Sequence, residues 1–65
     1  MITEDMTVNH ILHEHPEAHS ILRRFHLDTD WAGPEPLEQA AWYRGVHVEE
    51  IVEALNRIMA QGGER

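Results

Sequence analysis

Hydrophobic residues recur along most of the chain at the spacing of amphipathic helices. The first pattern follows Thr7, a favourable capping residue, and consists of Val8, Ile11 and Leu12. These positions share one helical face. We expect this helix to end before Pro16, because a residue that precedes proline is pushed out of the helical conformation.

Pro16 suits the first position of a second helix, since its missing N–H costs nothing there. The apolar stripe of this helix is Ala18, Ile21, Leu22 and Phe25. We expect the helix to end at Phe25 or His26. Residues 27–35 show no helical period and are rich in Asp, Thr, Gly and Pro, which predicts a turn-rich loop ordered by the neighbouring helices.

Two further helices are predicted after this loop. Pro36 opens the third, which ends at Gly45 in a left-handed conformation. Its inward face is formed by Leu37, Ala40 and Ala41. The fourth begins after His47, in the position of a cap, and runs to about Ala60. Its stripe is Ile51, Val52, Leu55, Ile58 and Met59, with Glu53 and Arg57 as an ion pair on the outer face.

Four short helices joined by sharp turns cannot form a long parallel bundle. The sequence therefore predicts an all-α fold, a compact orthogonal array of four short helices in a single domain of residues 1–65, with 61–65 as a frayed tail. The expected core is Val8, Ile11, Leu12, Ile21, Leu22, Phe25, Leu27, Leu37, Ala41, Ile51, Val52, Leu55 and Ile58.

Composition excludes several classes of function. The 65 residues include no Cys, so disulfides, thiolate zinc sites, Cys-ligated iron–sulfur clusters and thiol catalysis are impossible within this chain. Five Arg and no Lys stand against twelve Asp and Glu, a net charge of −7 that disfavours nucleic acid and anionic membranes as partners. The acidic start resembles no secretion signal, and no apolar run approaches the roughly 20 residues of a membrane span, so we expect a cytoplasmic protein.

Several stretches resemble, in order and spacing, a family of small bacterial domains. They are MITEDMTV (1–8), IL (11–12), HPE (15–17), PLEQAA (36–41), GVHVEEI (45–51) and ALN (54–56). The chain resembles the hybrid-cluster-protein-associated domains of unknown function, which are similar to the amino-terminal domain of ScdA-type iron–sulfur repair proteins. The resemblance implies a small helical fold related to redox proteins.

One departure from that family bears on activity. The resemblance implies two cysteines in the loop after the second helix, where this chain has residues 29–32, TDWA, and a glycine at the loop entrance, where it has His26. Thiol–disulfide exchange needs an attacking thiolate and a second thiol. Both are missing, so we expect no redox activity and no cofactor.

Histidine is frequent, with six in 65 residues, and four lie near one another in sequence. These candidates for a zinc, nickel or copper site are His10, His13, His15 and His19. The alternative interpretation is a solvated helical face. Asp28 and Asp30 could likewise hold a cation or act as an acid–base pair, although carboxylates in a short loop more often cap turns and helices.

Two tryptophans indicate a contact surface. At about 100° per residue, Trp42 lies about 140° from Leu37, away from the inward face, while Trp31 lies in the loop that lacks the cysteines. Exposed aromatics are typical of protein interfaces, although a small domain can also use a half-exposed Trp to cover its own core. We take Trp31, Trp42, Asp28 and Asp30 as candidate partner-binding residues.

The sequence thus predicts a non-catalytic helical interaction module that binds a protein partner or forms a homodimer, a Cys-less relative of redox-associated domains. The alternative is a His-based metal-binding or redox-accessory protein. A third hypothesis is an enzyme centred on Asp28 and Asp30.

Overall fold

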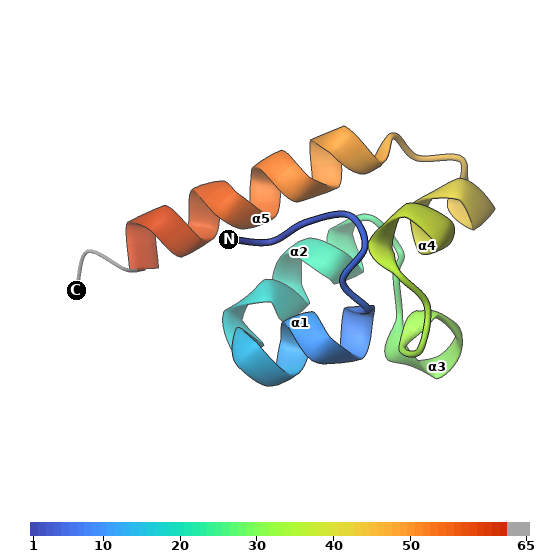
Figure 1. Cartoon of the computed structure of the whole chain (residues 1–65), viewed down its shortest axis with the longest axis horizontal. Coiled ribbons are helices and arrows are strands. Elements are labelled where there is room, and N and C mark those ends of the chain that lie inside the picture. The colour runs from blue at the N-terminus through green and yellow to red at the C-terminus, as the bar shows by residue number, and fades with distance from the viewer. Residues whose placement is uncertain (63–65) are drawn as a thin grey trace.

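The helices of the structure follow the hydrophobic pattern of the sequence. A computed structural model describes residues 1–62 (Figure 1). Its elements are α1 (Val8–Glu14), the 3-10 turn η1 (Pro16–Ala18), α2 (His19–Arg24), α3 (Thr29–Ala32), α4 (Leu37–Arg44) and α5 (Val48–Gly62). With η1 and α2 counted as one segment, the described residues contain the four expected helical segments and no strand, so the all-α prediction is confirmed.

Capping geometry confirms the predicted start of α1 and the predicted end of α4. The Thr7 hydroxyl accepts a hydrogen bond from the His10 backbone N–H at 3.1 Å, which satisfies one of the free donors at the start of α1. Gly45 ends α4 with φ of 70°, the left-handed conformation that favours glycine. The ion pair between Glu53 and Arg57 is present at 3.9 Å on the exposed side of α5. This helix reaches Gly62, and residues 63–65 of the expected tail lie outside the described part of the chain.

The expected loop at residues 27–35 contains a helical turn that the sequence analysis missed. α3 has only four residues, too few for a helical period to be visible in the sequence. The Ala32 N–H donates to the Asp28 carbonyl at 2.8 Å, and the Ala32 side chain is fully buried. Leu27 is buried as predicted, and its N–H donates to the Leu22 carbonyl across His26, which takes a left-handed φ of 64°.

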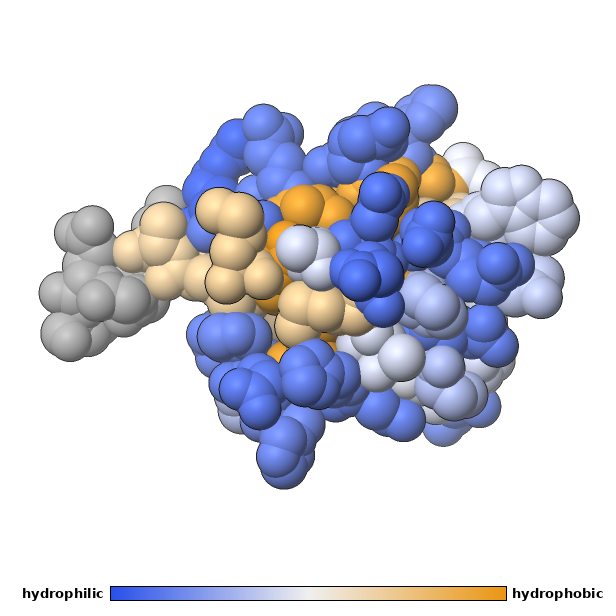
Figure 2. Space-filling model, viewed as in Figure 1, coloured by the Kyte–Doolittle hydropathy of each residue, from blue (hydrophilic) through white to orange (hydrophobic). Residues whose placement is uncertain are grey.

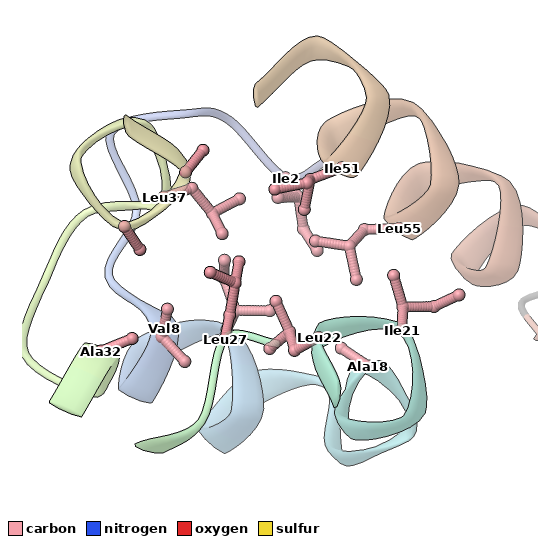
Figure 3. Close-up of a cluster of buried hydrophobic side chains, with 13 residues drawn as sticks. Ile2, Val8, Ala18, Ile21, Leu22, Leu27, Ala32, Leu37, Ile51 and Leu55 are labelled. Atoms are coloured by element: carbon pink, nitrogen blue, oxygen red, sulfur yellow. The ribbon is translucent and has the colours of Figure 1, made fainter. Parts of the chain in front are cut away.

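The core lies between α5 and the shorter helices beneath it (Figures 1 and 3). It forms one cluster, made of Ile2, Val8, Ile11, Ala18, Ile21, Leu22, Leu27, Ala32, Leu37, Ala40, Ala41, Ile51 and Leu55. Four expected members pack against this cluster but are only partly buried, namely Leu12, Phe25, Val52 and Ile58. These four residues lie at the edges of the apolar helical faces, whose central residues are buried. None of the helices within residues 1–62 is long and apolar enough to cross a membrane.

The starts of α1 and α4 satisfy each other's free backbone donors. The N–H groups of Val8 and Asn9 donate to the carbonyls of Glu35 and Gly33, at 3.1 and 2.8 Å. In return, the first two N–H groups of α4 donate to the carbonyls of Met6 and Glu4, at 2.9 and 3.0 Å. Because the first N–H groups of a helix have no partner within it, this exchange fixes the two helices against each other.

Candidate functional site

Three aromatic side chains meet at one end of the molecule, and we call them the aromatic cluster: Trp31, Trp42 and Tyr43. Trp31 comes from α3, while the other two are adjacent on α4. The ring centroids of Trp31 and Tyr43 are 6.3 Å apart with the planes at 80°, and those of Trp42 and Tyr43 are 5.5 Å apart at 67°. Both pairs have the edge-to-face geometry that aromatic rings prefer. Tyr43 therefore connects the two tryptophans.

The side chains of the aromatic cluster are large, yet all three are exposed to solvent. Trp42 is 73% exposed, Tyr43 58% and Trp31 36%. The expectation that Trp42 faces away from the core is confirmed, since the inward face of α4 consists of the fully or almost fully buried Leu37, Ala40 and Ala41. Trp31 is thus the most covered of the three rings and Trp42 the least.

Backbone contacts help to hold the elements that carry the cluster. Gly33 follows α3 directly, and its carbonyl accepts the Asn9 N–H of α1. A side chain at Gly33 would have its Cβ 2.8 Å from Asn9 Oδ1 and 2.9 Å from the Thr29 carbonyl oxygen, so only glycine allows this close approach. The exchange of hydrogen bonds at the starts of α1 and α4 then sets α4 beside α3.

The surroundings of the cluster are polar and charged. A shallow hollow of about 340 Å³ is lined by Trp31, Tyr43 and Arg44, and a second of about 390 Å³ by Glu38, Gln39 and Trp42. Both are open to solvent. An apolar centre with a polar rim is the common organisation of protein interfaces.

The structure places the two candidate aspartates at the start of α3, close in sequence to Trp31. Asp28 is the residue before the helix, where its side chain makes no capping hydrogen bond, and Asp30 lies in the first turn. Both are exposed. Both carboxylates are therefore accessible to a partner.

Of the four candidate metal ligands, His10 and His13 lie on α1, His15 lies between α1 and η1, and His19 begins α2. His10, His13 and His19 are exposed, and His15 is partly buried with its Nδ1 3.8 Å from a carboxylate oxygen of Glu17. In residues 1–62, no three His, Asp or Glu side chains come together in a way that could hold a metal ion. The structure thus brings the aromatic residues together and leaves the histidines apart.

Sequence reasoning missed Tyr43, although the signal for it was present. At about 100° per residue, Tyr43 lies about 120° from Leu37 on the side opposite Trp42, so it is also outside the inward face. Applying the same arithmetic to every aromatic residue of α4 would have found it.

Comparisons of the chain with protein-family models, with curated proteins and with solved structures give no match.

Proposed function

We propose that this protein is a non-catalytic helical interaction module of the cytoplasm, a Cys-less relative of redox-associated domains, that binds a protein partner or a second copy of itself through the aromatic cluster. The observation that carries the proposal is the exposure of two adjacent large aromatics, Trp42 at 73% and Tyr43 at 58%, in a chain of only 65 residues. Trp and Tyr are enriched among the residues that dominate binding energy at interfaces.

The energy available at this surface is large for so small a domain. A Trp or Tyr side chain buries about 150–250 Å² when fully covered. With 73% of Trp42 exposed, covering it removes about 150 Å² from water, worth up to about 4 kcal/mol at roughly 25 cal/mol per Å². Association consumes part of this gain, because translational and rotational freedom is lost.

The alternative interpretation, that Trp42 covers its own core, has little support in the geometry. A side chain that served this purpose would be mostly covered by the domain, whereas about a quarter of Trp42 is covered. The inward face of the same helix is formed by other residues, among them the fully buried Leu37 and Ala40.

The experiment is sedimentation velocity of the untagged protein at several concentrations, followed by capture of partners from an extract of the source cells. Wild-type protein should self-associate or retain a specific partner. The Trp42→Ala variant should lose that association, while Glu14→Gln, a change at an exposed α1 residue, should retain it. A wild-type monomer at all concentrations that recovers no partner would contradict the proposal.

A further inference from the structure

A second surface lies away from the aromatic cluster, between the N-terminal segment (residues 2–4) and the first two turns of α5. It is a groove of about 410 Å³. Its apolar lining comes from Ile2, Val48 and Val52, and its acidic lining from Glu4, Glu49 and Glu53. Figure 2 shows apolar surface on this side of the molecule, bordered by hydrophilic side chains.

Both walls of the groove are fixed by the fold. Asn56 of α5 holds the Ile2 backbone through two hydrogen bonds, at 2.9 and 3.2 Å. The Glu4 carbonyl accepts the Glu38 N–H of α4 at 3.0 Å, which anchors the other end of the segment. The groove is therefore preformed, and little conformational entropy is lost when it is filled.

The spacing on α5 places apolar and acidic residues in parallel rows. Val48 and Val52 are four residues apart and lie on the same side of the helix, and both are only partly buried. Glu49 and Glu53 form the adjacent row and are exposed. An occupant that fits this surface needs an apolar edge beside a positively charged one.

We propose that this groove binds a cationic amphipathic segment of a partner protein, which packs apolar side chains on Val48 and Val52 and directs Arg or Lys side chains to Glu4, Glu49 and Glu53. These carboxylates lie at the edge of an apolar surface, where charge complementarity guides the orientation of a partner. Glu53 forms an ion pair with Arg57 at 3.9 Å, and both side chains of this pair are exposed.

The charge of the groove argues against other occupants. Phosphate groups of a nucleic acid or of an anionic lipid would meet carboxylates of the same sign. A second copy of the chain has only five basic residues against twelve acidic ones, so it offers few cations to place opposite the three carboxylates of the groove. This proposal is independent of the aromatic cluster, which belongs to α3 and α4.

The test is fluorescence anisotropy with a fluorescently labelled synthetic peptide. Its sequence places Leu along one face of a helix and Arg along the adjacent face. Two control peptides carry Glu in place of Arg, or Ser in place of Leu. The Leu–Arg peptide should bind saturably with one-to-one stoichiometry, and each control at least about tenfold more weakly. In NMR spectra of the isotope-labelled protein, the largest chemical-shift changes on addition of the peptide should lie at residues 2–4 and 48–53.

Two variants with the same change of net charge separate the groove from general attraction. Glu49→Arg should weaken binding of the Leu–Arg peptide at least about tenfold. Glu14 is an exposed α1 residue outside the groove, so Glu14→Arg should weaken this binding less than about threefold. Trp42→Ala should bind it as the wild type does. Absence of saturable binding, equal weakening by both charge variants, or shift changes centred on Trp31 and Trp42 would overturn the proposal.

Discussion

Asn56 connects α5 to the N-terminal segment, and replacing it with Ala tests how the fold holds that segment. Its Oδ1 accepts the Ile2 N–H at 2.9 Å, and its Nδ2 donates to the Ile2 carbonyl at 3.2 Å. The Ile2 side chain is 1% exposed and lies beside Ile51 in the core (Figure 3). One side chain in the middle of a helix thus positions a core residue 54 positions away.

The expected loss of stability follows from two opposing effects. Each hydrogen bond contributes about 0.5–1.5 kcal/mol, so removing both costs about 1–3 kcal/mol. Ala is a better helix former than Asn by up to about 0.7 kcal/mol, which offsets part of that cost. We expect Asn56→Ala to lower the free energy of unfolding by about 0.5–2.5 kcal/mol, the loss of the hydrogen bonds being the larger effect.

The assay is urea unfolding followed by circular dichroism, with NMR shifts of residues 2–4 as a local readout. His13→Ala is the control, because His13 is an exposed α1 residue for which the described part of the chain shows no side-chain hydrogen bond. The control should be unchanged or slightly more stable. If Asn56→Ala were as stable as the wild type, with unchanged shifts at residues 2–4, the assigned role of Asn56 would be refuted.

Three further substitutions test other parts of the fold by thermal or urea unfolding. Leu27→Ala should cost about 2–5 kcal/mol, because the side chain is 1% exposed within the core, and a loss below about 1 kcal/mol would contradict this. His26→Gly should be neutral or stabilise by up to about 1 kcal/mol, since its φ of 64° suits glycine, and a clear loss would show that the imidazole has a structural role. Gly33→Ala should cost about 1–3 kcal/mol, because its Cβ would lie 2.9 Å from the Thr29 carbonyl oxygen, and an unchanged midpoint would refute that contact.

Much of the fold could be predicted because its helices are long enough to show a period. The starts and ends of α1 and α4 follow from the cap Thr7, the proline before Leu37 and the left-handed Gly45. α3 could not be found in this way, since a single turn contains no repeat of the 3.6-residue period. What marks it in the structure is the burial of Ala32, which depends on contacts with distant residues.

The N-terminal segment was not expected in the core because it has no secondary structure of its own. Ile2 is buried through its hydrogen bonds to Asn56, a contact between the two ends of the chain. A local signal did exist: Asn is a poor helix former, and Asn56 lies next to the buried Leu55 in the longest helix. A polar residue placed against local preference often has a partner elsewhere in the fold.

The candidate site was predicted in part. Angular position on α4 predicted that Trp42 faces solvent, and the structure confirms it. The contact of Trp31 with Tyr43 depends on how α3 packs beside α4, which is set by backbone hydrogen bonds between segments far apart in sequence. The sequence pattern alone contains no information on that packing.

The central claim is that the aromatic cluster serves association rather than stability, and Trp42→Ala tests it most directly. Thermal unfolding and sedimentation should be measured on the same preparation, beside Leu27→Ala as the variant that damages the core. We expect Trp42→Ala to weaken association with a partner or second copy at least about tenfold, while its unfolding midpoint stays within about 3 °C of the wild type. A midpoint lowered as strongly as that of Leu27→Ala, with association unchanged, would contradict the account.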